Sequence, residues 1–215
     1  PKVADAIVEA IWDTRIAPQR ILDPSAGTGV FVNAVDFHDP YAEITCFEKD
    51  PLTGLILRHL HPDDTVRVQG FETIEPAYEG HFDLITSNIP FGDVSLFDPA
   101  FSSSRDPVRR QGAWAIHNYF FMKSVDLVRD GGLVAFITSQ GMADAERNRP
   151  VREWLMERCD LVAAVRLPNN LFTDHAGTEV GSDLIVLQKN SAARPLSERQ
   201  RDFIETRTLS NGITV

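Results

Sequence analysis

The sequence predicts an α/β protein with a doubly wound, mostly parallel sheet. Short apolar segments typical of buried strands alternate with segments whose apolar residues recur at helical spacing. The 215 residues, 43% of them hydrophobic, suffice for one α/β domain with a sizeable core. Two strand-like segments, residues 20–23 and 82–86, run into polar and turn-forming residues, so we expect a site at their carboxyl ends.

The first half of the chain shows strands that alternate with helices. Apolar residues at helical spacing predict a first helix over residues 3–14. Asp50 is a suitable N-cap for a helix that begins at Pro51. The remaining expected elements are strands at residues 20–23, 43–50, 65–70 and 82–86 and helices at residues 29–37 and 51–60.

The second half begins with residues 93–113, which lack periodicity and predict a long irregular loop. A helix follows at residues 114–128, because Phe120, Phe121 and Val125 fall on one side of it. After a turn at residues 130–132, we expect strands at residues 133–138, 161–168 and 183–189 and a helix at residues 148–158.

The loop after Asp23, with the sequence Asp-Pro-Ser-Ala-Gly-Thr-Gly, is the first candidate site. Gly27 and Gly29 permit a tight turn and a close approach of the backbone to a ligand. Dinucleotide-binding loops of the G-x-G-x-x-G type hold a pyrophosphate at such a place, but here an acid opens the loop and the third glycine is absent. An acid repels phosphate, so the loop suits a cationic ligand. A fortuitous glycine loop is the alternative.

Glu48 ends the second expected strand and is the next candidate, with Lys49 beside it. In doubly wound folds, an acid at the tip of the second strand accepts hydrogen bonds from ribose hydroxyls. A solvated surface glutamate is the alternative.

Asn88, Ile89, Pro90 and Phe91 form the second candidate site. The asparagine offers an acceptor and donors on one short planar group. Pro90 removes a backbone N–H and favours an extended Ile89, which lets nearby carbonyl groups face outward. Phe91 adds a flat ring, so together these groups can hold a planar amine. A β-turn with an Asx cap is the alternative, since turns favour the same residue types.

Both candidate sites resemble signature motifs of S-adenosylmethionine-dependent amino methyltransferases, especially the adenine-N6 DNA methyltransferases. Asn-Ile-Pro-Phe at residues 88–91 resembles N-P-P-F, with Ile89 in place of the first proline. Residues 23–31 resemble the cofactor loop D-P-x-x-G-x-G-x-F, and this loop precedes the catalytic motif as in the gamma-type enzymes. The likeness spans about residues 1–190. It implies a Rossmann-like class I methyltransferase fold whose last strand is antiparallel.

The resemblance implies S-adenosylmethionine as the cofactor, which carries an ammonium and a sulfonium and no phosphate. Related enzymes place an acid before an aromatic that meets the cofactor adenine; here Gly70 stands at the acid's position, Phe71 is the aromatic and Glu72 follows. The cofactor-binding residues expected from the resemblance are Asp23, Pro24, Ser25, Ala26, Gly27, Thr28, Gly29, Phe31, Glu48, Lys49, Phe71 and Asn88.

The resemblance also implies that Asn88, Ile89, Pro90 and Phe91 are the catalytic residues. The exocyclic nitrogen of adenine is a poor nucleophile because its lone pair is delocalised into the ring. The Asn88 oxygen and a nearby carbonyl group accept its two hydrogens and direct the lone pair at the sulfonium methyl. A base inside duplex DNA is unreachable, so it has to be flipped out. Phe91 is the first candidate for stacking on it and Phe172 the second; a core position is the alternative for Phe172.

The charge distribution bears on the DNA partner. A formal net charge of −10 argues against strong DNA affinity of this chain alone. Arg109 and Arg110 lie in a small basic cluster within residues 93–113, which can contact DNA phosphates or belong to a solvated loop. Gamma-type enzymes normally carry a target-recognition domain after the catalytic one. A recognition domain or subunit is therefore expected outside these residues.

Metal and membrane partners are not expected. Cys46 and Cys159 lie in apolar segments and predict buried, reduced thiols; there is no Cys-x-x-Cys pattern and the six histidines do not cluster in sequence. His117 is expected to be a packing or surface residue. No signal peptide and no apolar segment long enough to span a membrane is present, which favours a cytoplasmic protein.

The sequence thus predicts a methyltransferase domain over residues 1–190 that methylates the N6 amine of adenine in DNA, as part of a larger restriction-modification protein. Residues 191–215 change in composition and are expected to form a linker or the start of a following segment, with Ser197 capping a short helix. Three alternatives stay open: an RNA base methyltransferase, a protein glutamine amide methyltransferase, and a non-catalytic cofactor-binding scaffold.

Overall fold

Seven strands form the sheet at the centre of the computed structural model, which describes residues 2–14, 16–92, 94–168, 181–192 and 194–206. They are β1 (Arg20–Asp23), β2 (Glu43–Phe47), β3 (Thr65–Arg67), β4 (Phe82–Asn88), β5 (Val128–Ser139), β6 (Cys159–Arg166) and β7 (Ser182–Lys189). Their order is β3-β2-β1-β4-β5-β7-β6, and β7 runs antiparallel to the other six of these strands. The predicted doubly wound, mostly parallel sheet with an antiparallel last strand is confirmed.

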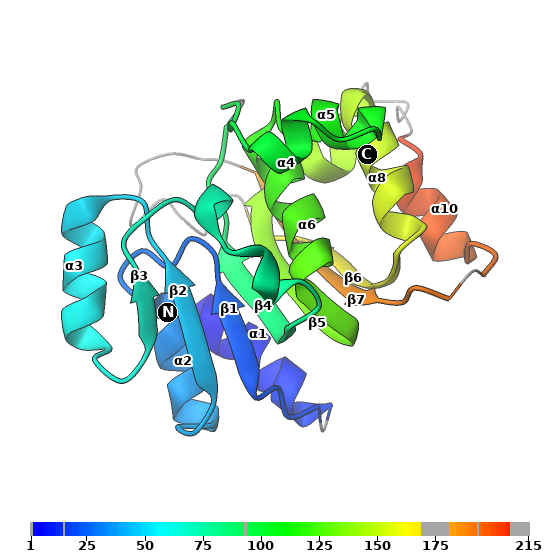
Figure 1. Cartoon of the computed structure of the whole chain (residues 1–215). Helices are drawn as coiled ribbons and strands as arrows, with labels where there is room; N and C mark the ends of the chain where they lie inside the picture. The colour runs from blue at the N-terminus through cyan, green and yellow to red at the C-terminus, as the bar shows by residue number, and fades with distance from the viewer. Residues whose placement is uncertain (1, 15, 93, 169–180, 193, 207–215) are drawn as a thin grey trace.

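Helices cover both faces of this sheet (Figure 1). One buried apolar cluster lies between the sheet and α1 and α2, and a second lies between the sheet and α6, α8 and α10. The helices of the described residues are α1 (Lys2–Asp13), α2 (Val30–His38), α3 (Pro51–Leu60), α4 (Pro99–Ser102), α5 (Pro107–Gly112), α6 (Ile116–Leu127), α7 (Gly141–Asp144), α8 (Arg149–Met156) and α10 (Glu198–Ile204), with the 3-10 turns η1 (Phe71–Thr73), η2 (Pro76–Tyr78) and η3 (Glu146–Asn148).

Strand β4 lies in the middle of the sheet and is buried on both faces. Its fully buried Leu84 and Ile85 belong to the two opposite apolar clusters. Because β1, β2 and β4 run parallel, their carboxyl ends meet at one edge of the sheet. That edge therefore brings together Asp23, Glu48 and Asn88, which are up to 65 residues apart in the sequence.

Residues 93–113 contain two short helices that the sequence did not reveal, so the prediction of an irregular loop throughout this segment is wrong. Each helix begins with a capping aspartate followed by proline. Asp98 accepts a hydrogen bond from the Ala100 N–H at 2.7 Å, and Asp106 accepts one from the Val108 N–H at 2.8 Å. Helices of four and six residues are too short to show apolar periodicity, whereas the Asp-Pro pairs are a usable start signal.

Strand β5 begins at Val128, five residues earlier than predicted. The expected turn at residues 130–132 lies inside the strand, where the pairing of β5 with β4 shifts register. Pairing with β4 outweighs the turn-forming tendency of residues 130–132, because it satisfies the backbone hydrogen-bonding groups of β5 on both sides of the register shift.

Helix α10 packs against the body of the protein. As expected, Ser197 caps it: the side chain accepts from the Gln200 N–H, and the Gln200 side chain accepts in return from the Ser197 N–H. Phe203 and Ile204 are buried in the same cluster as α8. The packed body therefore extends beyond residue 190.

None of the helices in the described ranges is both long and apolar enough to cross a membrane. Cys46 and Cys159 are buried free thiols, as predicted. Burial raises the pKa of the Cys159 thiol to about 12 and that of Cys46 well above its usual value, so both thiols stay protonated at neutral pH.

Candidate active site at the carboxyl edge of the sheet

The loop between β1 and α2 is fastened by backbone hydrogen bonds. The Ala26 N–H donates to the Phe47 carbonyl at 2.9 Å, which ties the loop to β2. Gly27 and Gly29 have φ values of 55° and 87°, in the left-handed region. At Gly29 a Cβ atom would also lie 2.6 Å from Nε2 of His61, so the position requires glycine for space as well as for backbone conformation.

Glu48 follows β2 and holds this loop from the side. Its two carboxylate oxygens accept hydrogen bonds from the Gly27 N–H at 2.9 Å and the Asp50 N–H at 2.8 Å. Each oxygen has a second lone pair, so the carboxylate is oriented and can still accept hydroxyl donors from a ligand. Lys49 is exposed and its Nζ lies 3.8 Å from a carboxylate oxygen of Glu72.

Asp23 is buried at the tip of β1, with 2% of its surface exposed. Its carboxylate accepts a hydrogen bond from the Ser25 N–H at 3.1 Å and is also hydrogen-bonded to the Ser87 side chain. Burial is the dominant effect and raises the pKa of the Asp23 carboxyl to about 7, although both hydrogen bonds act to lower it. Asp23 therefore changes charge near neutral pH, which is common at functional sites.

A cavity of about 340 Å³ opens beside these strand tips. That volume is within the range of small-molecule sites. Its wall is formed by Pro24, Ser25, Glu48, Lys49, Gly70, Phe71, Glu72, Pro90, Val94, Ser95, Leu96, Phe97, Ile116 and Phe120. Thr28 is exposed outside this wall, and Phe31 is buried in the core between α1 and α2.

Phe71 forms part of the cavity wall and also of the core. Its ring makes edge contacts with Phe47 and Tyr119 and lies 5.0 Å from the ring of Phe120, centroid to centroid. The carboxylate of Glu72 folds back over Gly70, in the space that a Cβ at position 70 would need. Glu72 therefore places a carboxylate where a side chain from position 70 would begin.

The tip of β4 lies next to the cavity. Asn88 is exposed at the end of the strand, and the next residue, Ile89, is buried, with its N–H donating to the Ile137 carbonyl at 3.0 Å. Pro90 lines the cavity, whereas Phe91 is half-buried against the apolar cluster of α1 and α2. Three consecutive residues of the turn thus face different surroundings: Asn88 faces solvent, Ile89 the core and Pro90 the cavity.

The two arginines predicted to contact DNA lie away from the cavity wall. Arg109 donates to both carboxylate oxygens of Asp126, at 2.9 and 2.7 Å, and its guanidinium lies 4.3 Å from the ring centroid of Phe101. Arg110 donates to the Ser104 carbonyl at 2.6 Å. Phe172, the second stacking candidate, lies outside the described residues.

Residues 94–97 also form part of the cavity wall, although the sequence motifs did not predict a role for them. Phe97 is the most conspicuous of them, because 76% of its surface is exposed although it is a large aromatic residue. In the sequence Phe97 stands nine residues after Asn88, close to the apolar residues Val94 and Leu96, and only its nearness to that motif marks it. Such exposed rings near a strand tip are candidates for ligand contact.

A family model described as N-6 DNA Methylase matches residues 53–212, about three quarters of the chain. The chain belongs to the N-6 DNA methylase family. The family predicted from the two sequence motifs is thereby confirmed.

Two known proteins are similar to this N-6 DNA methylase chain. It is 27% identical over 195 residues to the "Defense against restriction protein B" of Escherichia phage P1, a match that covers 86% of this chain and 8% of that protein. It is 26% identical over 210 residues to the "Type II methyltransferase M.XamI" of Xanthomonas campestris pv. amaranthicola, covering 92% of this chain and 39% of that protein. The chain spans less than half the length of either relative.

The fold of this N-6 DNA methylase chain also matches a solved structure from Listeria monocytogenes. That protein is described as a class I S-adenosylmethionine-dependent methyltransferase; the TM-score is 0.69 at 15% identity, covering 92% of this chain and 62% of the other. The likeness confirms the class I methyltransferase fold predicted from the sequence.

Proposed function

We propose that this chain is the catalytic part of an enzyme that transfers a methyl group from S-adenosylmethionine to the N6 amine of adenine in DNA. One observation carries the proposal: in an N-6 DNA methylase family member, the parallel strands β1, β2 and β4 bring Asp23, Glu48 and Asn88 to one edge beside a cavity. The first two residues supply acceptors for a cofactor, and the third supplies an amide for a target amine.

The residues around the cavity fit S-adenosylmethionine. Asp23, Glu48 and Glu72 make this edge acidic, which suits a cation and disfavours a phosphate-bearing dinucleotide. Glu48, already oriented by two backbone N–H groups, is positioned to accept ribose hydroxyls. When bound, S-adenosylmethionine supplies an electrophilic methyl group on its sulfonium.

Glu72 is proposed to take the role of the acid that related enzymes have at position 70. Its carboxylate lies over Gly70, and both residues line the cavity together with the ring of Phe71. A larger residue at position 70 would collide with that carboxylate. In this chain the acid is therefore proposed to come from position 72 in place of position 70, so that an acid and an aromatic still lie at the same end of the cavity.

Asn88 is proposed to hold the target amine. Its side-chain oxygen accepts one hydrogen of the amine and a carbonyl group of the turn at Ile89 and Pro90 accepts the other, which directs the nitrogen lone pair away from both acceptors. The methylated nitrogen can lose its proton after methyl transfer, so no strong base is needed before the step. The chain then accelerates the reaction mainly by positioning the amine. Phe91 and Phe172 are proposed to stack on a flipped-out base.

DNA is the proposed partner, with recognition residing outside this chain. The net charge of −10 is unfavourable for autonomous binding, and the two arginines of α5 are engaged with Asp126 and the Ser104 carbonyl. The direct test is transfer of tritiated methyl groups by the parent protein to duplex DNA, RNA and a glutamine-containing protein. Labelled N6-methyladenine in DNA is expected; label only in RNA or protein, or none, contradicts the proposal.

Replacing Glu48 by alanine is expected to weaken S-adenosylmethionine binding by about 1–3 kcal/mol, because buried hydrogen bonds to the ribose are lost. The matched control is Glu43→Ala: Glu43 is an exposed acid at the other end of the same strand and is expected to leave the affinity unchanged. Titration calorimetry measures both variants. Equal affinities of Glu48→Ala and the unmodified chain contradict the role of Glu48.

Cofactor affinity is expected to rise as the pH increases from about 6 to about 8, because the Asp23 carboxyl, whose pKa is about 7, becomes the anion that a cation favours. In the unliganded protein the raised pKa of Asp23 has the opposite pH dependence, because it acts on folding stability. The folded state holds this proton more tightly than the unfolded state, so the contribution of Asp23 to stability falls as the pH rises from its usual pKa of 3.8 to about 7. Calorimetry across this pH range measures the affinity, and Asp23→Asn is expected to flatten the profile. An unmodified chain with a flat profile refutes the role of Asp23.

A further inference from the structure

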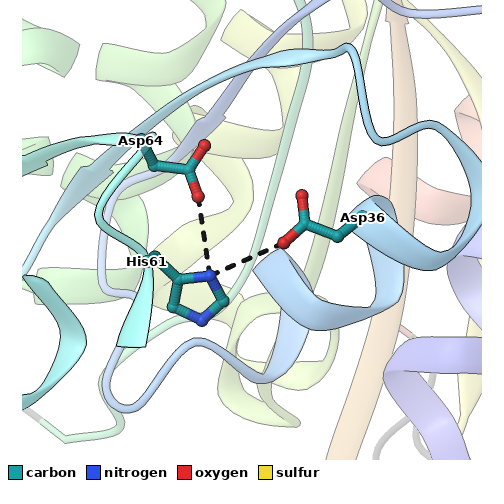
Figure 2. Close-up of side chains that lie close together, drawn as sticks. All are labelled: Asp36, His61 and Asp64. Carbon is teal, nitrogen blue, oxygen red and sulfur yellow. Dashed lines mark ion pairs between the residues drawn. The ribbon is translucent and has the colours of Figure 1, made fainter. Parts of the chain in front are cut away.

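Asp36, His61 and Asp64 form a cluster outside the proposed active site. Asp36 is on α2, His61 ends α3 and Asp64 immediately precedes β3 (Figure 2). Nδ1 of His61 lies 3.5 Å from a carboxylate oxygen of each aspartate. The three candidate ligand atoms lie within 4.8 Å of one another. Sequence alone did not suggest this grouping, because α2 and α3 are separated by a complete strand.

The imidazole is buried and directed into the cluster. Only 6% of the His61 side chain is exposed, and Figure 2 shows Nδ1 between the two carboxylates. The opposite ring nitrogen, Nε2, is buried without a hydrogen-bond partner among the described residues and lies behind Gly29. Nδ1 is therefore the ring nitrogen that faces the two carboxylates. The packing of the ring against Gly29, in the loop after β1, fixes the orientation of the imidazole.

The two distances from Nδ1 suit ligands that share one ion better than hydrogen-bond partners. At 3.5 Å, Nδ1 is farther from each oxygen than the 2.7–3.2 Å typical of an N–H···O hydrogen bond. Two ligands about 2.1 Å from one ion at a tetrahedral angle lie about 3.4 Å apart. Asp36, whose side chain is 42% exposed, has room to rotate toward such an ion.

Among the basic side chains of the described residues, His61 alone is paired with the two aspartates. Within the described part of the chain, neither aspartate forms an ion pair with a lysine or arginine. One divalent cation balances the charge of two carboxylates, and imidazole with carboxylate is a donor set suited to Zn²⁺.

We propose that Asp36, His61 and Asp64 bind a divalent transition-metal ion of the Zn²⁺ type, with water completing its coordination. The site is structural. It joins the end of α3 to α2, and its histidine backs onto Gly29 of the loop after β1. A bound ion holds His61 against that loop and stabilises the left half of the sheet in Figure 1, where α2, α3 and β3 lie.

Titration of the metal-free chain with Zn²⁺ by calorimetry is expected to show one saturable site, and Zn²⁺ is expected to raise the thermal midpoint. Asp36→Asn and Asp64→Asn are each expected to weaken binding by about tenfold or more. The matched control is Asp63→Asn, which removes the same charge from an exposed neighbour in the same loop and keeps all three ligands. It is expected to bind Zn²⁺ within about twofold of the unmodified chain.

Anomalous scattering at the zinc edge provides a second, independent readout in crystals soaked in Zn²⁺. A peak between the three side chains is expected. Absence of a one-to-one site, or equal affinities of all three variants, overturns the proposal and leaves His61 as a buried side chain that contacts two aspartates. The result does not depend on methyl transfer, so it is separable from the proposed function.

Discussion

Asn88→Ala is expected to slow single-turnover methyl transfer by about 100-fold or more while S-adenosylmethionine affinity stays nearly unchanged. The reason is positional. Glu48 lines the cavity and Asp23 is buried directly behind the lining residues Pro24 and Ser25, whereas Asn88 is exposed at the tip of β4 and does not line the cavity. Loss of its amide removes an acceptor for the target amine and leaves the acceptors for the cofactor in place.

The measurement is rapid-quench methylation of duplex DNA by the parent protein, with calorimetric titration of each variant. Asn88→Asp keeps an acceptor oxygen but adds charge, so a small residual rate is expected. Asn190→Ala is the control, because Asn190 bonds to Asp160 beyond the end of β7, away from the cavity. If Asn88→Ala methylates at the parental rate, the turn-capping interpretation of residues 88–91 replaces the catalytic one.

Arg152→Met is expected to lower the free energy of unfolding by about 3 kcal/mol or more. Arg152 is fully buried on α8. Its guanidinium donates to the Ile204 carbonyl at 3.1 and 2.9 Å, the Met142 carbonyl at 3.1 Å and the Ala145 carbonyl at 2.9 Å. Methionine approximates the volume of the side chain but leaves these three carbonyl groups without their donor, and it removes the hydrogen bonds from α8 to the end of α10.

The matched control is Arg149→Met on the same helix. The Arg149 side chain is 44% exposed and pairs with Glu153 at 3.1 Å, and exposed pairs of this kind contribute little to stability because solvent screens them. Urea unfolding followed by circular dichroism measures both variants. Equal losses in the two variants would show that the buried hydrogen bonds of Arg152 do not hold α10 in place.

The sequence was sufficient for the sheet and for the two motifs of the site. Buried strands such as residues 82–86 leave a continuous apolar pattern, and capped helices such as the one after Asp50 leave a start signal. Parallel strands then require their carboxyl ends to share an edge. That rule alone brings the loop after Asp23, the acid Glu48 and the tip at Asn88 together, without knowledge of any side-chain contact.

The tertiary structure decided what each of these side chains touches. Whether Arg109 contacts solvent or Asp126 depends on where α5 packs relative to α6. The amino-acid sequence around Arg109 does not determine that packing. The same holds for residues 190–204, whose polar composition suggested a linker although Phe203 and Ile204 complete the core.

Burial likewise belongs to the fold and not to the residue type. Asp23 has the same carboxyl group as any aspartate, yet enclosure at the end of β1 raises its pKa to about 7 because the charged form loses its hydration. The cluster of Asp36, His61 and Asp64 arises in the same way, from three segments that meet only after β2 has paired with β1 and β3. Local sequence patterns reflect local backbone preferences and amphipathicity, whereas contacts between distant side chains are set by packing.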